Sequence, residues 1–346
     1  MKTLLRVGFV IGIVVITPWL AAAQGDDPEQ TWCVSVWYPS AEHPGGLDSI
    51  TNHLDVIHEI NPFWYAANAD GTLRVSPDGE NAEKLQAWRD AGLLILPTIA
   101  HASPFAIDDS LRVEHIETIV ALVEQWDYDG IDIDYESFPL STRDDFSDFI
   151  ETLAGRLHAN GRLISIAVHA KTADQAAWES ATAQDWTRLA PAVDFFKIMT
   201  YDYTSSASRD PGPIGPPEWA SDVLAYAATV TDLSKVRLGL HFYGYRWQRS
   251  DVMITTWESV QRTIESFDLS IERNPADMEA YIEVHARGLP KQTVYVADAA
   301  GLQYKLTLLL STHPELGGVA IWGLGGEDPA NWDVLREFAQ GQCGTG

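Results

Sequence analysis

One short segment of the 346-residue chain carries an acid at every second position: Asp132, Asp134 and Glu136. Side chains alternate along a β-strand, so the three carboxylates share one face and the apolar residues between them share the other. Burying unpaired carboxylates costs several kcal/mol each, so a purely structural row of three is unfavourable. A solvated edge strand or a calcium site is the alternative, although calcium loops place their ligands on turns. The pattern therefore favours a catalytic strand.

Glu136 comes last in this row, and Asp134 precedes it by two residues, roughly 6.6–7 Å of backbone. Carboxylates this close cannot all ionise easily, and a shared proton raises the pKa of the group that must donate it. A general acid with a raised pKa suits the cleavage of a glycosidic bond near neutral pH. We therefore expect Glu136 to protonate a leaving oxygen.

The chain around this segment alternates short β-branched or aromatic runs with amphipathic helical patterns, such as residues 82–91, 113–126, 144–159 and 218–230. The expected strands are Trp32–Tyr38, Phe63–Ala67, Leu93–Ile99, Gly130–Glu136, Leu163–His169, Phe195–Tyr201, Val236–Phe242 and Gly318–Trp322. Eight strands separated by helices predict an α/β protein that closes into a (β/α)8 TIM barrel, with a doubly wound open sheet as the alternative. Glu136 then falls at the C-terminal mouth, where barrel enzymes hold their chemistry.

The spacing is regular except between the last two strands. Residues 245–298 hold an additional helical pattern, Thr256–Phe267, and an additional strand pattern, Gln292–Ala297. We therefore expect a barrel domain over residues 30–340, with a small inserted α+β subdomain at 245–298 between strands 7 and 8.

The first 23 residues have the pattern of a signal peptide: Lys2 and Arg6 precede an apolar stretch from Val7 to Leu20, and three alanines follow. The stretch is short for a bilayer span, and an uncleaved membrane anchor is the alternative. We expect a secreted protein, extracellular or in the cell envelope, without a stable membrane anchor. Its formal net charge of −26 at pH 7 argues against nucleic acid as a partner, and we expect a monomer.

The acidic segment, Asp129-Gly-Ile-Asp-Ile-Asp-Tyr-Glu136, resembles the D-G-x-D-x-D-x-E signature of glycoside hydrolase family 18, which also lies on the fourth barrel strand. Further segments resemble family motifs in the same order: Lys197–Tyr203 the M-x-Y-D motif, Gly239–Trp247 the seventh-strand segment, and Gly317–Asp328 the closing strand with its Trp. The Pro-Gly-Pro-Ile loop and the Tyr-Gly-Tyr-Arg-Trp run resemble most the bacterial spore-cortex-lytic branch.

The resemblance implies retaining, substrate-assisted hydrolysis of β-linked N-acetylhexosamine glycans, with no cofactor and no metal. Glu136 is then the general acid and base, and the 2-acetamide oxygen of the sugar is the nucleophile. Asp134 orients the acetamide, and Asp132 supports Asp134 from below. Tyr201 donates a hydrogen bond to the acetamide carbonyl, and Trp322 forms the floor beneath the sugar.

The remaining members of the expected substrate-binding set are Met199, Asp202, Asp129, Tyr38 and Trp247. Tyr38 and Trp247 end strands and could equally be stacking platforms for a sugar or packing residues of the wall.

Several alternatives stay open. His101, His169 and His241 end the third, fifth and seventh strands and could in principle bind zinc, although hydrogen bonds to a hydroxylated ligand suffice to explain them. A lectin on the same barrel would bind a chitin-like glycan without cutting it, but such lectins typically lack the acid that Glu136 supplies. The N-acetylglucosamine-containing glycan is open as well, and we rank peptidoglycan strands slightly ahead of chitin oligomers.

The two cysteines, Cys33 and Cys343, lie near the two ends of the mature chain. An even count in an exported protein favours a disulfide. The first strand starts at the bottom of the barrel, and the last helical pattern, 331–339, returns the chain there. The fold therefore predicts a Cys33–Cys343 disulfide that closes the barrel seam.

Overall fold

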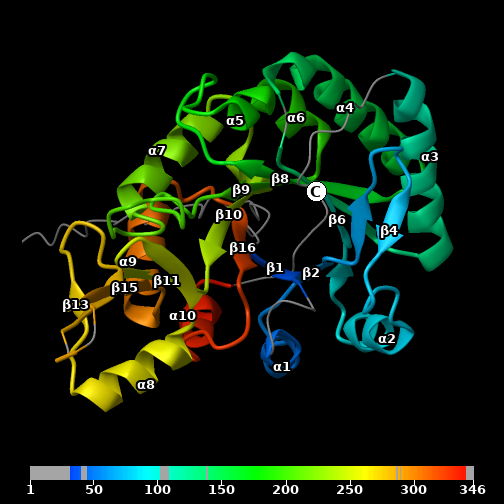
Figure 1. Ribbon diagram of the computed structural model, residues 1–346. Helices are drawn as coiled ribbons and strands as arrows, with labels where there is room; N and C mark the ends of the chain where they lie inside the picture. The colour runs from blue at the N-terminus through cyan, green and yellow to red at the C-terminus, as the bar shows by residue number, and fades with distance from the viewer. Residues whose placement is uncertain are drawn as a thin grey trace, which may run out of the picture.

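The computed structural model describes residues 32–39, 45–101, 109–137, 139–285, 287–288 and 290–339 (Figure 1). The predicted signal peptide, residues 1–23, and Cys343 lie outside these ranges. Among the helices inside them, none combines the length and the apolarity that crossing a bilayer requires.

Parallel strands at eight positions close into a barrel, as expected. In one run of paired strands, β1 pairs with β2 and β2 with β5; in the other, β6, β7, β8, β9, β10 and β16 pair in that order, and β16 pairs with β1. The short strands β5 and β6 together fill the third of the eight positions. Their bounds are β1 Cys33–Tyr38, β2 Glu59–Pro62, β5 Leu94–Ile95, β6 Thr98–His101, β7 Gly130–Tyr135, β8 Leu163–His169, β9 Phe195–Met199, β10 Val236–His241 and β16 Gly318–Trp322.

The third barrel position is divided between β5 and β6 by Leu96 and Pro97. Proline has no N–H for the ladder, so the regular pairing stops there. The closure continues through single hydrogen bonds: the Leu96 N–H donates to Ile60 O at 3.1 Å, and the Asp132 N–H donates to Pro97 O at 3.0 Å. One interrupted strand, β5 followed by β6, therefore joins the second barrel strand to the fourth.

The second barrel strand lies earlier than the sequence predicted. It is β2, Glu59–Pro62, whereas Tyr65–Ala67 is β3, which forms a hairpin with β4 (Leu73–Val75) and pairs with β6. The reason is that Glu59 and Asn61 point polar groups into the barrel and interrupt the apolar pattern that identifies a buried strand.

Helices cover the outside of the barrel (Figure 1). Their bounds are α1 Gly46–Asn52, α2 Ala82–Asp90, α3 Asp109–Trp126, α4 Arg143–Ala159, α5 Glu179–Ala183, α6 Trp186–Ala192, α7 Pro217–Ala227, α9 Ala299–Thr312 and α10 Asn331–Phe338, with 3-10 turns η1 at Leu140–Thr142 and η2 at Leu233–Lys235. On β7 the apolar side chains face this ring, because the Tyr135 ring stacks on Phe149 of α4 at a centroid distance of 5.9 Å. The acidic side chains of β7 must therefore point into the barrel.

The insertion is richer in strands than the sequence predicted. Its antiparallel sheet has the order β12-β11-β15-β14-β13 and packs against α8, Trp257–Phe267. The strand bounds are β11 Gly244–Gln248, β12 Asp251–Thr255, β13 Glu272–Arg273, β14 Ala280–Val284 and β15 Gln292–Val296. β12 is largely exposed and β13 has two residues, so neither carried a clear pattern. β11 and β14 are as long as β15 and were missed.

Candidate active site

A cavity of about 980 Å³ lies at the C-terminal ends of the barrel strands. Its walls come from the strand ends, from the β3–β4 hairpin, and from the loops after β8 and β9. The predicted site residues that line it are Asp134, Glu136, Met199, Tyr201, Asp202 and Trp322. These residues therefore share one space, which makes it the candidate active site.

Asp132 lies on β7 below this cavity and is fully buried. Its Oδ2 accepts hydrogen bonds from Trp37 Nε1 at 3.0 Å and from the Thr98 hydroxyl at 2.8 Å. Its Oδ1 accepts from the Ser165 hydroxyl and, at 2.9 Å, from the Lys197 ammonium. Thr98 and Ser165 are the register neighbours of Asp132 on β6 and β8, so the parallel pairing itself delivers two of these donors.

Lys197 of β9 compensates the buried negative charge, a role that the sequence analysis did not assign. Its Nζ lies 2.7 Å from Glu59 Oε1 and 2.9 Å from Asp132 Oδ1, and it also donates to Asn61 Oδ1 at 2.8 Å. Both carboxylates and the ammonium are 2 % exposed or less. The layer below the cavity is thus a buried ion cluster, in which loss of one partner typically costs about 3–5 kcal/mol.

Asp134 lies one step higher on β7 and has a different environment. It is 6 % exposed, and its Oδ1 is buried without a hydrogen-bond partner among the described residues. Burial, followed by the Glu136 and Asp132 carboxylates, raises the pKa of Asp134 well above its usual value, and Lys197 opposes this only in part. The sequence analysis expected the raised pKa on the proton donor, Glu136, whereas the pKa that burial and neighbouring acids raise is that of Asp134. A buried acid with an unused oxygen is a group that a ligand can satisfy.

Glu136 directly follows β7 and is held through its backbone. Its N–H donates to His101 O at 3.1 Å, and its carbonyl oxygen lies 3.0 Å from His169 Nε2. Its partly exposed carboxyl lines the cavity. The backbone is therefore fixed while the carboxyl faces the space that a substrate would occupy.

Three tyrosines lie near the ends of β9 and β10: Tyr201, which lines the cavity, and Tyr243 and Tyr245, which bond to Asp202. Burial raises the pKa of Tyr201 well above its usual value, and the Asp134 and Glu136 carboxylates add to the shift, so its hydroxyl remains a donor. Asp202 follows with a positive φ of 59°, and its Oδ1 accepts from the Tyr243 hydroxyl at 2.5 Å and the Tyr245 hydroxyl at 2.9 Å. These bonds hold Asp202 in a left-handed conformation that non-glycine residues seldom adopt.

Trp322 ends β16 and lines the same cavity. Its ring packs against Phe63 at 5.1 Å and meets Trp37 edge-on at 6.4 Å between centroids. Trp37 in turn donates to Asp132, so the aromatic floor and the buried ion cluster are directly connected.

Two of the predicted substrate-binding aromatics do not line the cavity. The Tyr38 hydroxyl accepts from Lys84 Nζ at 3.1 Å, and its ring packs edge-on against Trp88 of α2 at 6.0 Å. Trp247 is 4 % exposed, and its Nε1 donates to Ser208 O at 3.0 Å. Both are therefore packing residues, and the prediction that they contact substrate is wrong.

Asp129 is also wrongly predicted as a substrate contact. It precedes β7 at the end opposite Glu136, and its Oδ2 accepts from the Ile95 N–H at 2.8 Å. It fixes the start of the strand, next to Gly130, where an added Cβ would lie 2.1 Å from Leu163 O. Its place in the motif reflects strand packing.

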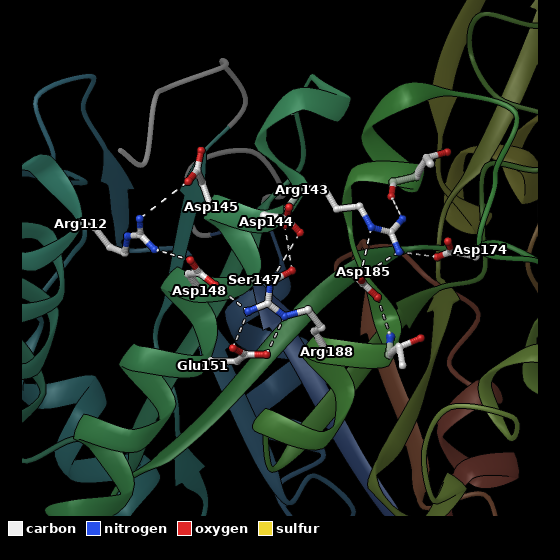
Figure 2. A network of polar contacts seen from close by, with 12 residues as sticks. Arg112, Arg143, Asp144, Asp145, Ser147, Asp148, Glu151, Asp174, Asp185 and Arg188 are labelled. Atoms are coloured by element: carbon white, nitrogen blue, oxygen red, sulfur yellow. Dashed lines mark hydrogen bonds and ion pairs between the residues drawn. The ribbon is translucent and has the colours of Figure 1, made fainter. Parts of the chain in front are cut away.

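The loop between β8 and α5 was not predicted as part of the site, yet it lines the cavity with Lys171 and with Trp178, which is 52 % exposed. Arg143 holds this loop, because its guanidinium donates to Thr182 O and to Asp174 Oδ1. Figure 2 shows these contacts beside a neighbouring network around two further arginines. The loop therefore presents an exposed tryptophan on a fixed backbone.

The neighbouring network lies among the outer helices α3, α4 and α6. Arg112 and Arg188 both bond to Asp148 of α4, at 3.0 and 2.6 Å, and Arg188 also bonds to Glu151 (Figure 2). It joins α3, α4 and α6, and its charges do not line the cavity.

The three strand-end histidines have separate surroundings. His169 contacts the Glu136 carbonyl, His101 accepts the Glu136 N–H at its backbone, and His241 Nε2 lies 3.4 Å from Glu279 Oε1. Within the described ranges, no group of three or more His, Cys, Asp or Glu side chains is placed to hold a metal ion.

A TIM barrel with a general-acid candidate at its C-terminal mouth is the arrangement of a barrel hydrolase. The sequence profile described as "Glycosyl hydrolases family 18" matches residues 98–327, and the chain belongs to this family. It is accordingly a glycoside hydrolase, and the family that its motifs predicted is confirmed.

Among curated proteins, the cortical fragment-lytic enzyme of Bacillus subtilis (strain 168) is 25% identical over 296 residues, which are 80% of this chain and 67% of that protein. Among solved structures, a chitinase from Chromobacterium violaceum has a TM-score of 0.82 at 23% identity and covers 89% of this chain and 99% of its own. The spore cortex-lytic enzyme SleL of Bacillus megaterium has a TM-score of 0.78 at 19% identity, covering 88% of this chain and 73% of its own. The similarity to these structures supports the fold.

Proposed function

We propose that the protein hydrolyses β-linked N-acetylhexosamine glycans with retention of configuration, through a substrate-assisted mechanism in which Glu136 is the general acid and base. The observation that carries the proposal is the placement of Asp134 beside Glu136 on one strand, at the edge of the cavity. A two-carboxylate retaining enzyme needs a nucleophile across the scissile bond, about 5–5.5 Å from the acid. Asp134 shares a strand face with Glu136, so it is poorly placed for that role.

The first step then breaks the bond between the anomeric carbon and the leaving oxygen. The Glu136 carboxyl gives its proton to that oxygen, while the 2-acetamide oxygen of the sugar bonds to the anomeric carbon and forms an oxazolinium. Asp134 accepts a hydrogen bond from the acetamide N–H and offsets the positive charge, and the Tyr201 hydroxyl donates to the acetamide oxygen. The buried, unpartnered Oδ1 of Asp134 supports this assignment.

The second step reverses the roles. The Glu136 carboxylate takes a proton from water, the water oxygen bonds to the anomeric carbon, and the acetamide is restored. Each step inverts the anomeric carbon, so the product keeps the configuration of the substrate. A lectin on the same barrel would not need Glu136 at this place.

We favour peptidoglycan glycan strands over chitin oligomers as the substrate, and we propose that the protein is exported to reach them. The cortical fragment-lytic relatives support this ranking.

Glu136→Gln tests the hydrolytic proposal. The variant cannot donate the proton, so kcat should fall by about a thousandfold on peptidoglycan strands and on N-acetylglucosamine oligomers, while folding and binding persist. Product masses from wild type and variant measure this. Glu258→Gln makes the same chemical change on α8 at a carboxylate 68% exposed and should keep full activity. Substantial turnover by Glu136→Gln would remove Glu136 from the role.

Substrate assistance has a separate test. A thiazoline analogue of N-acetylglucosamine mimics the oxazolinium and should inhibit competitively. An oligomer whose reacting sugar carries a free amine should not be cleaved, because the nucleophile is missing. Equal rates on acetylated and deacetylated oligomers would refute this mechanism and leave the hydrolytic proposal intact.

A further inference from the structure

Arg74 is an exposed residue with its guanidinium on the wall of the cavity that holds Asp134 and Glu136. It lies on β4, lines the cavity, and makes no hydrogen bond or ion pair with another described residue. The acids that follow it in sequence have other partners: Asp78 pairs with Lys84 at 2.5 Å, and Glu80 accepts from the Tyr65 hydroxyl at 3.3 Å. In a chain with a formal net charge of −26, this unpaired cation needs an explanation.

The other cation of the cavity lining is already engaged. Lys171 has no exposed side-chain surface, donates to Gln184 O at 2.7 Å, and lies 3.6 Å from Asp174 Oδ1. Burial lowers its pKa to about 8. Arg74 therefore stands out among the described lining residues as a permanently charged donor without a partner.

The sheet register connects Arg74 to the catalytic strand. Arg74 on β4 pairs with Ala66 on β3, Ala66 pairs with Ala100 on β6, and Ala100 pairs with Asp134 on β7. Residues in register on neighbouring strands point to the same face of a sheet, and all four line the cavity. Three strand spacings separate the ends of this row, roughly 14 Å.

The two residues in the middle of the row are alanines. Their small side chains put no bulky group into the cavity between the acid that would hold the acetamide and the guanidinium beyond it. A neighbour of a sugar bound over Asp134 can therefore extend along this row and bring one of its substituents to Arg74.

We propose that Arg74 binds the carboxylate of an acidic neighbouring sugar, specifically the 3-O-lactyl carboxylate of a muramic acid residue next to the N-acetylglucosamine over Asp134. A planar guanidinium matches a carboxylate with two parallel hydrogen bonds. Chitin has no such group, so Arg74 selects peptidoglycan strands. The inference rests on the proposed function, because it assumes that a glycan strand occupies the cavity.

The contact between Arg74 and a free lactyl carboxylate also requires an earlier reaction on the glycan strand. In intact peptidoglycan the lactyl carboxyl forms an amide with the stem peptide, so its charge is absent. Hydrolysis of that amide restores the carboxylate. The preferred substrate of this protein is therefore a strand from which an amidase has removed the peptides.

Binding measurements on the Glu136→Gln protein test the inference without turnover. The probes are glycan strands freed of peptides by an amidase and N-acetylglucosamine oligomers of equal length. Adding Arg74→Gln should weaken binding of the acidic strands by about 10- to 100-fold, the effect of a hydrogen bond between charged groups. Binding of the neutral oligomers should not change. Arg74→Lys should recover part of the affinity, because it keeps the charge but not the planar fork.

Arg262→Gln is the matched control. It removes the same charge from α8, where the side chain is 62% exposed, and should affect neither ligand. An Arg74→Gln protein that binds acidic strands as well as its parent, or that loses both ligands equally, would overturn the inference, as would failure of the parent to bind acidic strands. Absence of turnover by the wild type would instead refute the proposed function and leave these binding results interpretable.

Discussion

Asp132 and Asp134 lie two residues apart on the same face of β7, yet their surroundings give them different properties. Asp132 accepts bonds from an ammonium, two hydroxyls and an indole. Asp134 has no such donor on Oδ1 and sits between two other acids. A fully hydrogen-bonded carboxylate and one with an unpartnered oxygen thus lie two residues apart on one strand, and the second lines the cavity.

The raised pKa of Asp134 makes folding stability depend on pH. The unfolded chain releases this proton near pH 3.9, whereas the folded protein keeps it up to a higher pH. Between those two pKa values the folded state binds more protons, so its stability should fall as pH rises, by about 1.4 kcal/mol per pH unit from this group. Asp134→Asn removes the titration and should stabilise the protein relative to wild type above that window, while activity falls severely.

Urea unfolding at several pH values measures this difference. Asp222→Asn is the control, since Asp222 is exposed on α7, and its curve should follow the wild type. If the free energy of unfolding of Asp134→Asn runs parallel to that of wild type across the range, Asp134 does not carry the raised pKa.

At the scale of the elements, the sequence predicted well wherever alternation was strict. The bounds of β8 and β16 agree with the predicted ranges, and the inward acids of β7 follow from the pattern itself. The pattern failed at β2, whose inward Glu59 and Asn61 are compensated by Lys197 from another strand. Such compensation depends on contacts between distant parts of the chain, which no local window contains.

Parity along a strand could have improved the site prediction. Asp129 stands an odd number of positions before Glu136, so it cannot share the catalytic face. Lys197 precedes Met199 and Tyr201 at alternate positions and therefore points inward with them. On β1, Ser35 points inward and donates to Glu59. Trp37 is two residues further along and also points inward, whereas Tyr38 is on the other face of the strand and does not line the cavity.

The loops could not be predicted in this way. Trp178 has no periodic pattern around it, and its place on the cavity wall depends on the bonds that Arg143 and Lys171 make to the loop. Glu279 of the insertion has a similar function, because its carboxylate accepts from the Ile214 and Gly215 N–H groups and so joins the insertion to the loop after β9. Both are interactions between elements that only the folded chain brings together.

At the scale of the whole molecule, the two ends of the described chain meet. Trp32 precedes β1, and its ring lies 6.0 Å from that of Phe338, the last residue of α10. Cys33 starts β1 beside Gly318 of β16 and is 1% exposed. Cys33 is disulfide-bonded, whereas its predicted partner, Cys343, lies outside the described residues, so the pairing stays a prediction. The chain leaves α10 next to the start of β1.

The contact between Trp32 and Phe338 favours the Cys33–Cys343 bond. Four residues after Ala339 can span at most about 14 Å, and a disulfide needs Cα atoms within about 7 Å of each other. Closing residues 33–343 into one loop should stabilise the protein by roughly 2–5 kcal/mol on a chain-entropy account. Dithiothreitol should therefore lower the Tm of the protein, whereas a Cys33→Ser/Cys343→Ser variant should start at the lower Tm and not respond. Because Cys33 is buried, thiols are best counted by alkylation in denaturant, and two free thiols in the unreduced protein would contradict the bond.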